Sequence, residues 1–189
     1  PRTERWQVNH KIPLSSLPKW NGEGKTLIDY LTDLTLYSDL DEMMKSDIAQ
    51  IVLTRFTYTA KDWFTTLPSE AQRVAMSSFN EFILCLWEHF MDVHWIDEHT
   101  IEYKEMCFWQ TGHTKELPLQ FIQCCLKYSC FLFSENDEND VGMVHHVLRV
   151  QPACWAIHLN TKSCNTVVEL LHKLKVMNEG LITDWERSE

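Results

Sequence analysis

Apolar residues recur at helical spacing along most of this chain. The clearest case is the stretch 79–90, where the apolar side chains fall on one wide face of a predicted helix. Ser78 and Glu81 stand in capping-box register, which marks the beginning of that helix. The pattern therefore predicts an amphipathic helix over 79–90 with its apolar face turned to a core.

The same spacing predicts further helices on both sides of this one. They begin near Thr26, at Ser46 or Asp47 (with a break at 57–59), near Asp97, at Pro118, after the acidic loop that ends at Asp140, at Pro152 and at the capping box of Thr166 and Glu169. Gly180 is expected to end the last helix. No segment shows sustained strand alternation. The sequence predicts an all-α protein of about eight or nine helices, in two small bundles.

The best internal boundary lies where glycine and small polar residues follow a helical run, at Gln110-Thr-Gly112. Pro13 and Pro18 exclude a continuous helix near the N-terminus. The predicted organisation is an extended arm over 1–18, an N-terminal lobe over 19–111, a C-terminal lobe over 112–181 and a tail over 182–189.

Charge narrows the classes of function. The formal net charge of −10 over 189 residues argues against a nucleic-acid-binding surface, because phosphate contacts need clustered lysines and arginines. The longest apolar region, 117–133, is interrupted by polar residues and is too short for a membrane span. We therefore expect no direct RNA contact and no membrane.

Seven cysteines and nine histidines raise the question of zinc, which needs two close pairs of ligands brought together. His145 and His146 are adjacent, so on a helix they point about 100° apart. Spacings of five separate His89, His94 and His99, which rotates them off one face. Glycine-rich nucleophile turns and phosphate loops are also missing from the sequence. We expect reduced thiols, no metal, no cofactor and no enzymatic activity; a zinc- or cysteine-dependent enzyme is the least favoured alternative.

Several aromatic and small residues recur in a recognisable order. An aromatic-x-Gly pair comes first, then Ala-x-x-Trp, then Phe-x-x-Phe with a later Phe. These residues are Trp20, Gly22, Ala60, Trp63, Phe79, Phe82 and Phe90. Their order and spacing resemble the capsid region of Gag from gypsy-type LTR retrotransposons, with Phe79 where that family has Trp.

A looser likeness lies in the second half. Gln110, Gly112, Glu116 and Phe121 resemble the major homology region of retroviral capsids, in which a Gln, a Glu and an aromatic tie a turn to the following helix. Cys124 stands where that region has Arg, and one residue separates Gln110 from Gly112. Because a partly satisfied polar network is costly, an apolar substitute is expected here.

The resemblance implies a structural capsid protein that self-assembles into a virus-like particle shell around RNA, in the cytoplasm. The N-terminal lobe would form rings of five or six, and the C-terminal lobe would make dimer contacts between rings. RNA would be held only indirectly, through a basic nucleocapsid segment that this chain lacks. The residues expected to supply assembly contacts are Leu27, Tyr30, Tyr37, Val141, Val144 and Leu148.

The alternative is a domesticated Gag fold that serves as a protein-protein interaction module, as in the Arc family, where an N-terminal lobe binds short peptides. An exposed apolar groove near the arm, without higher-order assembly, would favour this alternative.

Overall fold

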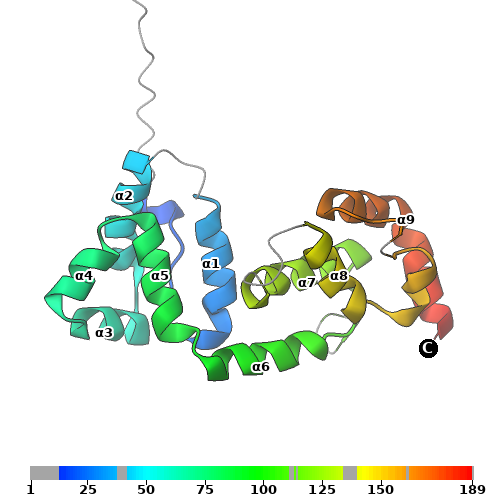
Figure 1. Cartoon of the computed structure of the whole chain (residues 1–189), viewed down its shortest axis with the longest axis horizontal. Coiled ribbons are helices and arrows are strands. Elements are labelled where there is room, and N and C mark those ends of the chain that lie inside the picture. Colours follow the sequence, from blue (N-terminus) through cyan, green and yellow to red (C-terminus); the bar gives the residue numbers. More distant parts are fainter. Residues whose placement is uncertain are drawn as a thin grey trace, which may run out of the picture. The chain divides into compact units, whose positions relative to one another are not determined.

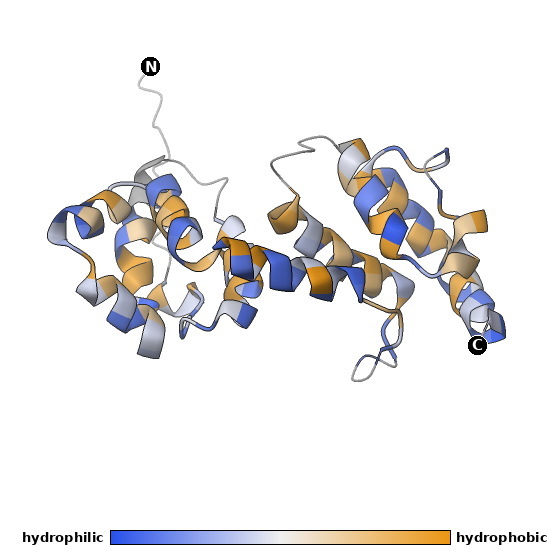
Figure 2. Cartoon of the chain, turned by 60° about the horizontal axis from the view of Figure 1, so that its bottom comes forward, coloured by the Kyte–Doolittle hydropathy of each residue, from blue (hydrophilic) through white to orange (hydrophobic). Residues whose placement is uncertain are grey.

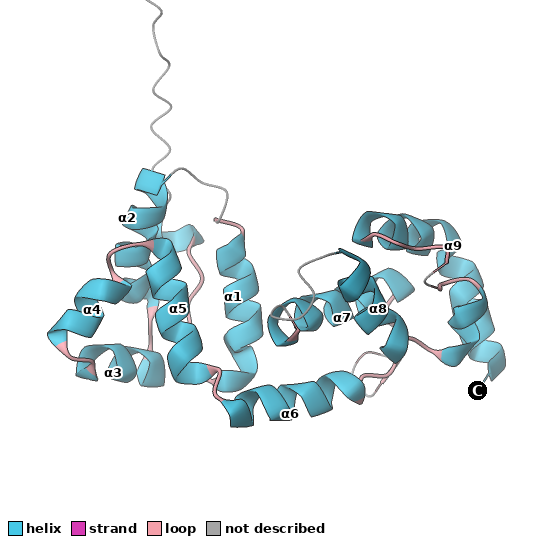
Figure 3. Cartoon of the chain, viewed as in Figure 1, coloured by secondary structure: helices cyan, strands magenta, loops and turns pink. Residues whose placement is uncertain are grey.

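The computed structural model describes residues 13–37, 42–110, 113, 115–133, 140–160 and 162–188. Within these ranges the chain forms nine α-helices and four short 3-10 helices and contains no strand (Figures 1 and 3). The all-α prediction is confirmed. The chain divides into two compact units, Pro1–Met91 and Asp92–Glu189.

The first unit is built from short helices. They are the 3-10 helices Leu14–Ser16, Gly24–Thr26 and Leu53–Arg55, with α1 (Leu27–Thr35), α2 (Glu42–Val52), α3 (Tyr58–Thr66), α4 (Ser69–Ala75) and α5 (Phe79–Phe90). The Ser78 hydroxyl accepts the backbone N–H of Glu81 at 3.1 Å, which confirms the predicted beginning of α5. Thr26 does not cap α1; its hydroxyl instead accepts the indole N–H of Trp20 at 3.1 Å.

Two elements of the first unit depart from the sequence pattern. The helix α2 begins at Glu42, before the predicted start at Ser46 or Asp47. The helix α4 was not predicted, because Ala75 is its only buried residue and its other side chains carry no apolar period. The packing of α4 against α5 stabilises a segment whose own pattern is weak.

The second unit is organised around α7. It comprises α6 (Val93–Lys104), α7 (Pro118–Leu132), α8 (Asp140–Val150), the 3-10 helix Ala153–Ile157 and α9 (Val167–Ser188). The helix α7 packs against α6, α8 and α9, and Pro118 occupies its first turn as predicted. Phe121, Trp155 and Leu174 lie in the shared core. Figure 2 shows polar and apolar residues on different faces of the helices, as expected when one face is buried.

The division between the units lies about 20 residues before the predicted boundary at 111/112. Helix α6 accounts for the difference, because it packs against α7 and Tyr103 joins the core of the second unit. Asp92 caps α6 by accepting the N–H of Trp95 at 2.8 Å, so the helix begins before the predicted Asp97. Ile101 of α6 is 56% exposed although it is apolar.

Helix α9 does not end at Gly180 as predicted, and residues 182–188 are helical instead of a tail. Leu181 is fully buried, and its carbonyl oxygen accepts the indole N–H of Trp155 at 2.8 Å. One turn later, His158 Nε2 lies 3.1 Å from a carboxylate oxygen of Asp184. These contacts outweigh the helix cost of a glycine, about 1 kcal/mol.

No helix in the described ranges combines the length and the apolar character that crossing a membrane requires.

Candidate functional site

The residues that carry the Gag resemblance in the first half lie together in the core of the first unit. Trp20 comes from the segment before α1, Trp63 from α3 and Phe90 from α5. The ring centroid of Phe90 is 4.7 Å from that of Trp20 and 4.9 Å from that of Trp63, both in edge-to-face geometry. Phe82 is fully buried and Phe79 is 6% exposed. The widely spaced aromatic motifs therefore form one cluster.

Gly22 and Ala60 are the two small residues of the motif. They are required because the backbone of the 20–22 segment comes very close to the beginning of α3. Gly22 has φ +87°, a conformation that favours glycine. A Cβ on Gly22 would lie 2.9 Å from the carbonyl carbon of Thr59 and closer still to the backbone nitrogen of Ala60. Ala60 donates its N–H to the carbonyl oxygen of Asn21 at 3.2 Å and is fully buried. Any larger residue at position 22 would push the 20–22 segment away from α3.

Gly22→Ala tests this contact. We expect it to lower the free energy of unfolding of the first unit by at least about 1–2 kcal/mol, the cost of a left-handed L-residue, with the steric clash in addition. Urea unfolding followed by circular dichroism measures the change.

Gly180→Ala is the matched control, because nothing lies within 4 Å of a Cβ at that helical position. This substitution should stabilise α9 by about 0.5–1 kcal/mol. Equal effects of the two substitutions would contradict the close contact at Gly22.

In the second half, Glu116 ties the turn that precedes α7. Its carboxylate accepts the backbone N–H of Trp109 at 3.1 Å, and its carbonyl oxygen accepts the indole N–H of Trp109 at 2.9 Å. Phe121 is buried against Phe108, with ring centroids 5.7 Å apart. Trp109 has φ +57° and is the partner that the sequence did not indicate. Hydrogen bonds between Glu116 and Trp109 therefore hold this turn, although an apolar substitute for the polar network was expected.

The other two members of the second motif have no comparable role. The Gln110 side chain is exposed, although its carbonyl oxygen accepts the N–H of His113 at 2.9 Å in the turn. Gly112 lies outside the described residues. The likeness to the major homology region therefore rests on Glu116 and Phe121.

Partial burial raises the pKa of Glu116, while the N–H from Trp109 and the nearby His113 act in the opposite direction. A carboxyl whose folded pKa is raised favours the fold most when it is protonated, and this contribution is lost as pH rises through the folded pKa.

Glu116→Gln keeps an acceptor for the Trp109 N–H without the charge. We expect Glu116→Gln to be at least as stable as the original chain at about pH 7, with the difference shrinking toward about pH 4.

Glu116→Ala separates the hydrogen bond from the charge. It removes the acceptor, so it should destabilise the second unit by about 1–3 kcal/mol at either pH. Thermal unfolding of both variants measures the effects, and equal stability of the Ala and Gln variants would contradict a role for the hydrogen bond.

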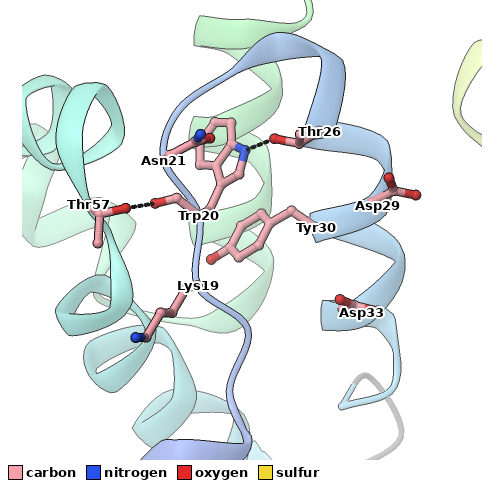
Figure 4. A pocket seen from close by; sticks show the side chains of 8 residues that line it. All are labelled: Lys19, Trp20, Asn21, Thr26, Asp29, Tyr30, Asp33 and Thr57. Atoms are coloured by element: carbon pink, nitrogen blue, oxygen red, sulfur yellow. Dashed lines mark hydrogen bonds between the residues drawn. The ribbon is translucent and has the colours of Figure 1, made fainter.

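The first unit also contains a pocket of about 380 Å³ beside α1 (Figure 4). Its lining combines aromatic, charged and small polar side chains, namely Lys19, Trp20, Asn21, Thr26, Asp29, Tyr30, Asp33 and Thr57. Two hydrogen bonds hold its walls, one from the Trp20 indole to Thr26 and one from the Thr57 hydroxyl to the Trp20 carbonyl at 3.2 Å. The pocket lies close to the predicted arm, but its rim is charged and not purely apolar.

Tyr30 is the unusual member of this lining. Its side chain is 3% exposed, and its hydroxyl has no hydrogen-bond partner among the described residues. Burial raises the pKa of the Tyr30 phenol, so the group is protonated at neutral pH. Buried hydroxyls are normally paired, so this unpaired one has a cost that the packing around the Tyr30 ring must offset.

The residues expected to make assembly contacts need correction. Leu27, Tyr30 and Val144 are at most 3% exposed, so they pack inside their own units and are not available to a second chain. Tyr37 is half-buried and donates its hydroxyl to the Ser16 carbonyl at 2.9 Å. Val141 is 44% exposed. Leu148 is half-buried against the core of the second unit. Helical spacing identified the apolar residues, but most of them are buried in the core of the unit to which they belong.

Burial makes three of the thiols less acidic. It raises the pKa values of Cys85, Cys125 and Cys130, whereas a reactive cysteine needs a lowered pKa. Across the described part of the chain, no three or more His, Cys, Asp or Glu side chains are grouped so that they could hold a metal ion.

No family model, curated protein or solved structure matches this chain. The functional argument therefore rests on the geometry of the two units and on the residues named above.

Proposed function

We propose that this chain is a structural capsid protein of the Gag type, whose function is self-association into a shell. The observation that carries the proposal is that three motifs, distant from one another in the sequence, pack against each other in the first unit. Gly22 lies against Ala60, and Trp20 and Trp63 both contact Phe90. Residues that matched by chance would not be expected to depend on one another for packing. Two compact helical units also agree with a two-lobed capsid protein.

Self-association requires apolar surface that the cores leave uncovered. Among the described residues of the first unit, the most exposed large apolar side chain is that of Tyr58, at 79%. Its φ of +46° is unfavourable for a bulky residue, yet the ring is held outside at the beginning of α3. Tyrosines of this kind are frequent anchors of protein interfaces. In the second unit, three residues of α8 were expected to make dimer contacts. Val141 is exposed, whereas Val144 is buried and Leu148 is half-buried.

Charge sets the conditions for assembly. Subunits with a formal charge of −10 repel one another, and salt screens this repulsion over a Debye length of about 10 Å at about 0.1 M and about 3 Å at about 1 M. We expect the mass measured by light scattering to rise with protein concentration, and to rise further with salt. A constant monomer or single dimer under all conditions would contradict the proposal.

Tyr58→Asn tests the anchor in the same assay. Asn tolerates the left-handed backbone conformation better than Tyr does, so the substitution should not lower the melting temperature. It removes the exposed ring, so association should need about tenfold more protein, the scale of one lost interface anchor. Unchanged association would exclude Tyr58 from the contacts.

A second candidate function, peptide binding by the first unit, is favoured by the pocket beside α1. Its lining combines charged, polar and aromatic side chains, and its volume of about 380 Å³ falls within the range that small-ligand sites use, about 300–1,000 Å³. A peptide could bind there whether or not the chain assembles.

A further inference from the structure

We infer that two copies of this chain pair through α9, with the two helices antiparallel across a two-fold axis. The inference rests on the proposed self-association, and it names the surface and the geometry of one of its contacts. Of the α8 residues expected to make dimer contacts, Val144 is buried and Leu148 is half-buried, so α8 has little apolar surface to offer.

Apolar side chains are uncovered on the outer face of α9. Val168 is 74% exposed and Val176 is 72% exposed. They are eight residues apart, which places them on the same side of the helix, opposite the buried Leu170, Leu174 and Leu181. Valine is a weaker helix former than the lysine, glutamate or alanine that usually occupies an exposed helical position. The stability of α9 itself therefore does not explain these two valines, whereas a partner surface does.

Gly180 leaves an open space on the exposed side of the same helix. Its position is exposed, and no described atom lies within 4 Å of a Cβ built there. A glycine in the interior of a helix is destabilising, and no close contact within the unit requires one here. The space lets a side chain from a second helix approach the α9 backbone closely.

The charges of the outer face complement a second copy of the same helix. Lys175 and Glu179 are both exposed, and neither has a salt-bridge partner among the described residues. Within one helix, a lysine four residues before a glutamate is the less favourable order of the two. An antiparallel copy runs in the opposite direction, so Lys175 of each chain lies opposite Glu179 of the other.

One arrangement satisfies all of these features. Lys175 precedes Glu179 by four residues, and Val176 precedes Gly180 by four. A two-fold axis level with residues 177 and 178 therefore brings both pairs opposite each other, to within one residue. The contact is self-complementary and closes as a dimer. Val176 of each copy fills the space beside Gly180 of the other.

The size of this surface fits a contact that is weak by itself. The 22 residues of α9 make a helix about 33 Å long. A single pair of such helices buries less than the roughly 1,600 Å² of a standard interface. Weak contacts suit a shell, because repeated contacts between linked subunits add up to a stable assembly.

Charge reversal in the full 189-residue chain tests the pairing. The dissociation constant of the dimer is measured by sedimentation equilibrium at low salt, where ion pairs are screened least. Lys175→Glu and Glu179→Lys each replace two attractive pairs by two repulsive ones, so each should weaken the dimer by about tenfold or more. Glu179→Lys also makes the chain less negative, so tighter association of this variant would overturn the inference.

An equimolar mixture of the two variants is the sharpest arm of the test. In the mixed dimer, the two glutamates of one chain lie opposite the two lysines of the other, so association should return to the level of the original chain. Each chain still carries its like charges four residues apart, so an effect confined to the single helix would persist in the mixture. A mixture that associates no better than its separate components would overturn the inference.

Two further variants test the apolar contact. Val176→Asp should weaken the dimer by about tenfold, because it places a charge where a valine is buried by the partner. Val93→Asp is the matched control, since Val93 is a 76% exposed valine on α6 of the same unit. Equal effects of the two substitutions would overturn the inference.

Gly180→Gln fills the open space with a good helix former. The melting temperature should hold or rise while the dimer weakens several-fold. Unchanged association of this variant would overturn the antiparallel arrangement.

The outcomes separate this inference from the proposed function. Large assemblies that form unchanged with every α9 variant would refute the pairing and leave the shell proposal intact. A dimer through α9 with nothing larger would support the pairing and contradict the shell. A monomer under all conditions would refute both.

Discussion

The close contact between the 20–22 segment and the beginning of α3 is the constraint on which the first unit depends. The carbonyl oxygens of Trp20 and Asn21 accept the N–H groups of Thr57 and Ala60, at 2.9 and 3.2 Å. This approach is open only to glycine at position 22. Once the segment is fixed, the Trp20 indole stacks on Tyr30 of α1, with centroids 5.2 Å apart, and meets Phe90 of α5. One backbone contact thus sets the position of three helices.

The second unit uses a similar device in a different place. Two tryptophan indoles donate to backbone carbonyl oxygens, Trp109 to Glu116 and Trp155 to Leu181. Each bond joins an aromatic core to a segment that its own sequence would not fix, the turn before α7 and the last turns of α9. Directed hydrogen bonds inside an apolar core favour one arrangement over its near alternatives. Units of fixed shape suit a protein whose proposed function is to repeat the same contacts many times.

The sequence predicted the elements with strong local signals and missed those that depend on partners. The helices α5 and α7 follow from apolar period, and Ser78 and Thr166 mark helix beginnings, the latter with the Thr166–Glu169 capping box formed. The continuation of α9 past Gly180 depends on Trp155 and His158, which are distant in sequence. The pattern also could not tell a core residue such as Tyr30 from a surface one, because apolar character does not show what covers a side chain. The pocket could not be predicted either, because its walls come from three segments that are separate in the sequence.

The central claim is that this fold assembles, and electron microscopy of concentrated protein at high salt tests it most directly. The claim predicts rings or closed shells of uniform curvature built from this chain alone. Dispersed single particles, or only amorphous aggregates, at concentrations where light scattering has reached its plateau would contradict it.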